Sequence, residues 1–255
     1  MFIAITVALV LISVVLHELG HAFAMRSKGI DIEAIGLGLG PAIATFGPFR
    51  CRFGSATTFS LRLLPIGAYV KPSGEGQREF KNLSYSDKAH ILGAGVLANC
   101  GFAFLLVMLL DFTHPRLFSN AFMLKLALVS GVGTILLRFG RKFIVPLAGC
   151  ALLGETVFAM ITAGPKGAVM GPVALGSFVA QNALGLPQAV LIAAVISLAL
   201  CLTNMLPIWP FDGGLTVRAL IVKVMPRLTP AYDLLAVPGF MALIACVVLS
   251  EFSKR

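Results

Sequence analysis

Charged side chains are scarce in this chain, because Asp, Glu, Lys and Arg together make up 12% of its 255 residues while 58% are hydrophobic. A soluble globular domain carries roughly 25% charged residues. The mean hydropathy of +0.95 is far too apolar for a fold whose surface faces water. The composition excludes an ordinary soluble domain and predicts an all-α polytopic membrane protein, with the lipid bilayer as its surroundings.

Cysteine is also sparse. The chain has five cysteines, an odd number, and none of them forms a C-x-x-C pair. Neither a disulfide framework nor a cysteine zinc site is therefore indicated. We interpret the cysteines as packing residues, because four of them fall in apolar segments.

Acidic residues number 11 against 20 Lys and Arg, which gives a net charge of +9. The basic residues are dispersed along predicted loops and accompany no recognised nucleic-acid motif, so a nucleic-acid partner is not expected. They do follow the positive-inside rule if the N-terminus lies outside, because most of them then fall on the cytoplasmic side. This pattern predicts a multi-pass protein with a cytoplasmic first loop.

Hydropathy predicts about six transmembrane helices, at residues 2–25, 89–110, 121–137, 143–163, 189–208 and 234–249. Between the first two lies the only sizeable polar region, residues 26–88, which is rich in glycine and β-formers. Its short β-type runs are separated by Gly-Pro and Gly-Ser pairs, which predicts hairpins. We expect a small cytoplasmic, membrane-associated β region within a single integral membrane domain, residues 1–255.

Histidine is rare as well, yet two of the four histidines form His17-Glu18-Leu19-Gly20-His21 within the first apolar segment. On a helix, His17 and His21 lie on one face and can reach one zinc at about 2.0 to 2.1 Å, with Glu18 beside them as a general base. The chain's own composition gives a chance occurrence on the order of 10⁻³. A structural histidine pair is the alternative, but ionisable residues inside a membrane are costly and usually functional.

A catalytic zinc site usually has three protein ligands and a water. The best candidate for the third ligand is Asp212, which follows a helix end broken by Pro207 and Pro210. Irregular backbone at membrane depth is tolerated where it is buried in protein or lines a cavity. The predicted topology brings Asp212 to the depth of the histidine pair. The alternative is an acid in a helix-terminating turn.

These motifs resemble those of the site-2 protease family of intramembrane zinc metalloproteases. The H-E-x-x-H pentad matches, and residues 204–214 match the N-x-x-P-x-x-P-x-D-G signature, with Phe211 where leucine is more usual. Residues 64–71 look like the family's membrane-associated β-loop. Residues 111–163 are unmatched and are expected to form two extra spans outside the family core. PDZ and CBS modules of other members are not seen.

The resemblance implies one Zn²⁺ per chain, bound by His17, His21 and Asp212, with Glu18 as the catalytic base. It also implies that Asn204 stabilises the oxyanion, although a hydrogen bond within the helix bundle is an equal alternative. The β region offers a strand edge that could pair with an extended peptide. Its expected substrate-binding residues, within residues 62–69, are Ile66, Gly67 and Tyr69.

The expected substrate is a single-span membrane protein, such as an anti-sigma factor, a membrane-tethered regulator or a leftover signal peptide. The format resembles a bacterial inner-membrane protein whose active site lies near the cytoplasmic side. A membrane zinc transporter is the main alternative, and it would not need Glu18 as a base. A catalytically inactive scaffold is less favoured, because every expected catalytic residue is present.

Overall fold

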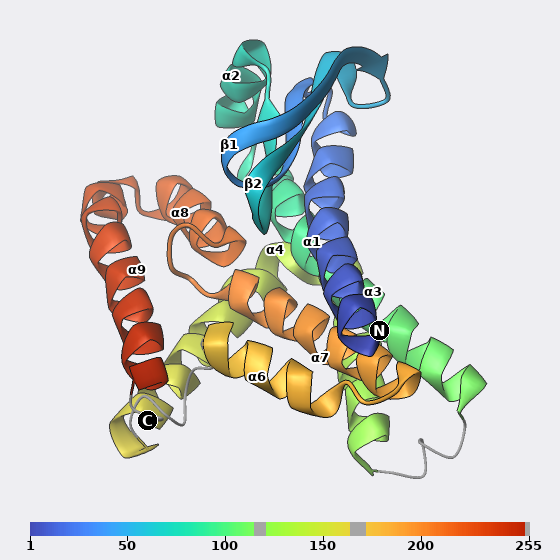
Figure 1. Ribbon diagram of the computed structural model, residues 1–255. Helices are drawn as coiled ribbons and strands as arrows, with labels where there is room; N and C mark the ends of the chain where they lie inside the picture. The colour runs from blue at the N-terminus through green and yellow to red at the C-terminus, as the bar shows by residue number, and fades with distance from the viewer. Residues whose placement is uncertain (115–120, 164–171, 253–255) are drawn as a thin grey trace.

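The computed structural model describes residues 1–114, 121–163 and 172–252, and it is mostly helical with one small sheet (Figure 1). This confirms a helical protein with a β region after the first helix. The elements, in chain order, are α1 Phe2–Arg26, β1 Ile32–Cys51, β2 Gly54–Pro72, α2 Gly74–Asn82, α3 Tyr85–Thr113, α4 Ala121–Ala163, α6 Pro172–Asn182, α7 Leu186–Met205, α8 Asp212–Val224, the 3₁₀ helix η2 Pro226–Leu228 and α9 Thr229–Phe252.

Four helical segments among the described residues are long and apolar enough to cross a membrane. They are Phe2–Arg26, Tyr85–Thr113, Leu186–Met205 and Pro226–Leu249. Each overlaps a predicted span, so the membrane character of the protein is confirmed. The fifth predicted span was extended too far, because α7 ends at Met205 and the chain then turns instead of continuing to residue 208.

The segments predicted as separate spans at 121–137 and 143–163 belong to one continuous helix, α4, of 43 residues. The absence of a break has a local cause, since residues 138–142 contain only Gly140 as a weak helix former. Its 43 residues would extend about 64 Å if they were straight, roughly twice the thickness of a bilayer core, but α4 is bent and contains Pro146. Figure 1 shows its middle near the start of α3 and both its ends lower in the view. The count of six spans stays a prediction.

Helix α3 is the centre of the bundle, because it packs against α1, α4 and α7. One buried apolar cluster joins α3 to α7 and to the first part of α4, through residues such as Val107, Ala193 and Leu126. A second joins the same helices further along, through Val96, Cys201 and others. By contrast, α9 lies at the edge beside α8 (Figure 1).

The sheet consists of two long strands, β1 and β2, which form an antiparallel hairpin beside the predicted Gly54-Ser55 break, whereas the predicted break at Gly47-Pro48 lies inside β1. Bulges let each strand pair twice, so that Ile35 of β1 lies opposite both Val70 and Phe59 of β2. Phe59 in turn lies opposite Phe46. Residues 68–72 have a partner on one side only within the described pairings, and they therefore form an edge of the sheet.

Candidate metal centre

The buried side chains of α1 form one stripe that carries polar groups into the bundle. Thr6, Ser13, His17, His21 and Ala24 are all buried, at spacings of seven, four, four and three residues. This is the repeat of one helical face. The lipid-exposed side of α1 is apolar, so the helix is polar toward the protein and apolar toward the membrane. The stripe holds both imidazoles inside the bundle, 8% and 7% exposed.

The third candidate ligand is Asp212, the first residue of α8, which follows a tight turn after α7. A side chain on Gly213 would overlap the carbonyl of Met205, so the turn can close only around glycine. The Tyr232 hydroxyl of α9 fixes the turn further, since it lies 2.8 Å from the carbonyl oxygen of Gly214 and 3.2 Å from that of Pro207. This packing places the Asp212 carboxylate against α1.

The three ligand atoms form a nearly equilateral triangle. His17 Nε2 and His21 Nε2 are 3.1 Å apart, and each lies 3.2 Å from Asp212 Oδ2. Ligands on a tetrahedral zinc at 2.0 to 2.1 Å are separated from one another by about 3.3 to 3.4 Å. The observed triangle therefore has the size of one face of such a site, and the three residues form a group that could hold one metal ion.

The hydrogen bonding around the triangle points to a cation. His21 Nδ1 lies 2.8 Å from the carbonyl oxygen of Ile91, which fixes the ring proton on Nδ1 and leaves the Nε2 lone pair facing the triangle. Asp212 Oδ2 is buried and has no hydrogen-bond donor of good geometry among the described residues. Electron-rich atoms that converge in this way repel one another unless a positive ion lies among them.

Glu18 lies beside the triangle, close enough to interact electrostatically with His17, His21 and Asp212. Its side chain is half-buried, and its carboxylate lies close to the backbone of Val70. Val70 belongs to the edge run of β2. The free edge of the sheet is thus directed at the candidate base, a relation that links the β region to the centre.

Sequence reasoning missed Asn99 and Gly95 of α3, which face the histidines. Asn99 Nδ2 lies 3.2 Å from His17 Nδ1, and its amide also contacts Ser13, which is 2.7 Å from Ser197. A side-chain carbon on Gly95 would lie 2.5 Å from His21 Nε2, so only glycine leaves the centre open. Asn99 could have been found as an amide in the middle of a predicted apolar span. Gly95 carries no such signal.

Among the interactions of the described side chains, Asn204 and Tyr69 have none with the triangle. Asn204 Nδ2 donates to the carbonyl oxygen of Leu200 in its own helix, at 3.0 Å. Gly67 is exposed with a φ of 78°, and Ile66 precedes it in β2. Hydrogen bonds from Ser60 and the Arg62 guanidinium hold the pKa of the Tyr69 phenol below its usual value. Tyr69 thereby braces the sheet.

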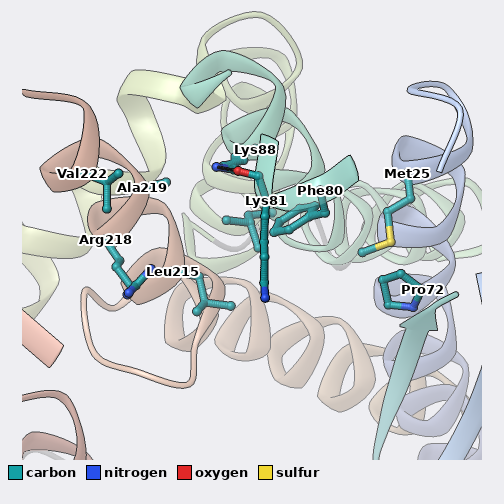
Figure 2. Close-up of a pocket in the computed structure, with 10 residues that line it drawn as sticks. Met25, Pro72, Phe80, Lys81, Lys88, Leu215, Arg218, Ala219 and Val222 are labelled. Atoms are coloured by element: carbon teal, nitrogen blue, oxygen red, sulfur yellow. Dashed lines mark hydrogen bonds between the residues drawn. The ribbon is translucent and has the colours of Figure 1, made fainter. Parts of the chain in front are cut away.

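A cavity of about 420 Å³ lies next to the triangle. On each of the helices α1, α3 and α8, a residue that lines it is about one turn from a residue at the triangle. Met25 follows His21 by four residues, Leu215 follows Asp212 by three, and Leu92 precedes Gly95 by three. Figure 2 shows Met25 and Pro72 on one side, Leu215, Arg218 and Val222 on the other, and Lys81 between them. The walls are mainly apolar, with Lys81, Lys88 and Arg218 as the charged lining residues.

Fold and centre together define a membrane protein with a buried metal-binding group, next to a glutamate in an H-E-x-x-H motif. The chain matches the sequence model of Peptidase family M50 over residues 5–246, and it belongs to that family. The predicted resemblance to site-2 proteases is confirmed. The match runs through residues 111–163, and the expectation that they lie outside the family core stays a prediction.

Curated relatives carry names of the same kind. The chain is 37% identical over 114 residues to the "Putative zinc metalloprotease slr1821" of Synechocystis, which is 41% of this chain and 29% of the relative. It is 34% identical over 115 residues to the "Putative zinc metalloprotease Cj1068" of Campylobacter jejuni, 41% of this chain and 30% of the relative. Identity to the "Probable protease eep" of Enterococcus faecalis is 39% over 66 residues, 26% of this chain and 14% of the relative.

The matched segments thus span less than a third of the curated relatives' length. The names of the Synechocystis and Campylobacter relatives specify zinc, and the ligand set of this chain fits the same metal. Two imidazoles and one carboxylate with room for a water are a catalytic zinc set, whereas structural zinc sites are closed by four protein ligands.

Proposed function

We propose that the protein is an intramembrane zinc metalloprotease that hydrolyses a peptide bond within or near a transmembrane segment of another membrane protein. The observation that carries this proposal is the convergence of His17, His21 and the orphaned Asp212 oxygen beside Glu18. A transporter needs metal ligands but has no use for a base fixed next to them.

Bound zinc would supply a water of lowered pKa and would polarise the carbonyl of the peptide bond. Glu18 would take a proton from the attacking water and deliver it to the amine nitrogen that leaves when the C–N bond breaks. The backbone of Val70 lies beside this carboxylate, next to the centre. The Asn204 side-chain amide donates one N–H to the carbonyl oxygen of Leu200. Its second N–H is proposed to donate a hydrogen bond to the developing oxyanion.

A transmembrane substrate must be unwound locally before its backbone can reach the centre, because helical carbonyls are already hydrogen-bonded. The edge formed by residues 68–72 supports a route for this, since it is unpaired on the side of Glu18. An extended substrate segment would add to this edge as a further strand. Ile66, Gly67 and Tyr69 would shape the approach to it.

The cavity in Figure 2 would receive substrate side chains next to the cleaved bond, because it adjoins the triangle on three elements. Its apolar walls suit residues from a membrane segment. Lys88 and Arg218 already have partners, since Lys88 donates to the carbonyl oxygen of Lys81 and Arg218 pairs with Asp233. Lys81 remains as a cation able to receive an acidic side chain of the substrate.

The proposed location is the bacterial inner membrane, with the N-terminus outside and the centre near the cytoplasmic side. The distribution of Lys and Arg supports this orientation. Arg26 and Lys28 at the end of α1, and Lys142 against Tyr85 at the start of α3, lie at one end of the bundle. The proposed substrates are single-span proteins, such as an anti-sigma factor, a membrane-tethered regulator or a signal peptide.

The test is co-expression of the wild type or Glu18→Gln with tagged single-span substrates, followed by measurement of both cleavage and bound zinc. We expect Glu18→Gln to abolish cleavage while one zinc per chain is retained. Glu79→Gln on the exposed surface of α2 removes the same charge and should cleave normally. Equal zinc transport by wild type and Glu18→Gln, without cleavage by either, would instead establish the transporter.

A further inference from the structure

The middle of α4 carries three cations, Arg138, Arg141 and Lys142, for which the described residues offer no acidic partner. None of the ion pairs found in the described part of the chain includes them. Arg141 is only 7% exposed, and its guanidinium lies 2.6 and 2.7 Å from the two ring nitrogens of His90. A histidine ring brings no negative charge.

A buried cation without a counter-charge is costly, and buried charges in proteins are normally paired. The nearest acidic side chain of α3, Asp87, is already paired with Lys28 and hydrogen-bonded to Ser84. The position is also fixed, because the Tyr85 hydroxyl donates to the carbonyl oxygen of Lys142 at 2.5 Å. The cluster is therefore held in place and lacks an anion.

Two adjoining cavities meet at this cluster. The first, about 170 Å³, is lined by Ser86, His90, Arg138, Phe139, Arg141 and Lys142. It combines cations with a hydroxyl in the first turn of α3, where the backbone N–H groups favour an anion. Arginine forks match the oxygens of a phosphate. The size and lining of this cavity suit a phosphate group.

The second cavity, about 360 Å³, shares His90, Arg138 and Arg141 with the first and continues between α1 and α3. Its remaining walls are mainly small and apolar side chains, namely Gly20, Phe23, Ala24, Ser27, Ala94, Leu97 and Ala98. A lining of this kind suits a hydrocarbon chain. The two cavities together match a ligand with an anionic head and an apolar tail.

We propose that this site binds an anionic phospholipid, with its phosphate between α4 and the start of α3 and one acyl chain along α1 and α3. The end of the bundle that carries most of the basic residues is the end at which anionic headgroups are attracted. The lipid tail would lie against Gly20, which faces α3 on the helix that carries His17 and His21. The proposal does not depend on the protease activity.

The experiment is native mass spectrometry of the full chain in detergent, titrated with dioleoyl phosphatidylglycerol or with the zwitterionic phosphatidylcholine of equal chain length. We expect phosphatidylglycerol to be retained about tenfold better, as one charge-assisted contact provides. Arg138→Gln with Lys142→Gln, both at exposed positions, should abolish the preference. The exposed Arg227→Gln should not. Equal retention of both lipids by the wild type would overturn the proposal.

Two further variants separate the lipid from a free anion and from a structural role. Ala98→Trp fills the cavity proposed for the acyl chain and should weaken phosphatidylglycerol binding. If inorganic phosphate raised the unfolding temperature of the wild type as much as phosphatidylglycerol does, the lipid assignment would be overturned. Arg141→Met removes the buried charge, so the lipid-free protein should unfold at an equal or higher temperature. The same variant should lose the stabilisation by phosphatidylglycerol. If Arg141 had only a structural role, Arg141→Met would lower the unfolding temperature of the lipid-free protein and would keep the stabilisation by phosphatidylglycerol.

Discussion

Replacement of Asn99 tests how the protein prepares His17 for metal. A histidine that binds zinc through Nε2 carries its proton on Nδ1, so the group facing Nδ1 must accept a hydrogen bond. In the structure Asn99 Nδ2 faces His17 and Oδ1 accepts from Ser13, so Asn99 accepts from His17 only with its side-chain amide turned over, which directs Oδ1 at His17 and Nδ2 at Ser13. Ser13 then donates to Ser197, and Ser197 donates to the backbone oxygen of Asn99 at 2.9 Å. Both serine hydroxyls in this buried chain then have an acceptor.

Asn99→Leu removes the acceptor at nearly constant volume. In the metal-free variant the His17 proton would move to Nε2, where Asp212 Oδ2 at 3.2 Å accepts it. Metal must then displace that proton, and the Nδ1 proton is left without a partner in the loaded protein. Loss of such an outer partner typically weakens metal binding about 10- to 100-fold, which is about 1.4 to 2.7 kcal/mol.

The assay is zinc affinity, measured by competition with a chelator on protein purified in detergent, with thermal unfolding as a check of the fold. Asn99→Asp retains the acceptor and should bind zinc at least as well as the wild type. Ser130→Ala is the matched control, because the hydroxyl of this buried serine donates to carbonyl oxygens of its own helix. Wild-type affinity in folded Asn99→Leu, or equal losses in Asn99→Leu and Asn99→Asp, would refute the reasoning.

Three further outcomes are expected. Gly95→Ala should reduce bound zinc well below one per chain by atomic absorption, whereas Gly101→Ala on the same helix, with its nearest neighbour at 3.8 Å, should not. Tyr232→Phe should destabilise the protein by about 0.5 to 1.5 kcal/mol and lower its unfolding temperature, and no change would contradict its role in the turn before α8. Arg62→Gln should raise the pKa of Tyr69, seen as an upward shift of the lowest tyrosine titration in ultraviolet absorbance; an unchanged lowest step would show that Arg62 does not act on Tyr69.

Much of the centre could be predicted because its signals are local. His17, Glu18 and His21 share one helical turn, and Asp212 follows a proline-broken helix end, so chemistry and hydropathy suffice to select them. The apolar helices were predictable for the same reason. Helix bounds were less so, since Met205 ends α7 through packing of the turn against Gly213.

The partners from other helices could not be predicted, because they depend on which faces meet. Asn99 reaches His17, and Ile91 accepts from His21, only because α3 packs against the polar stripe of α1. The double pairing of β1 depends on bulges that no local signal reveals. The unbroken course of α4 through its basic residues shows that charge alone does not end a helix.

The stripe along α1 also bears on the order in which the protein can become active. His17 and His21 enter the membrane with the first helix, but Asp212 arrives only after α7 has been synthesised. A nascent chain that stops at Met205 therefore carries two imidazoles and Glu18 without the carboxylate that completes the triangle. Until α8 docks, the centre lacks one of its three candidate ligands and cannot bind metal with the full set.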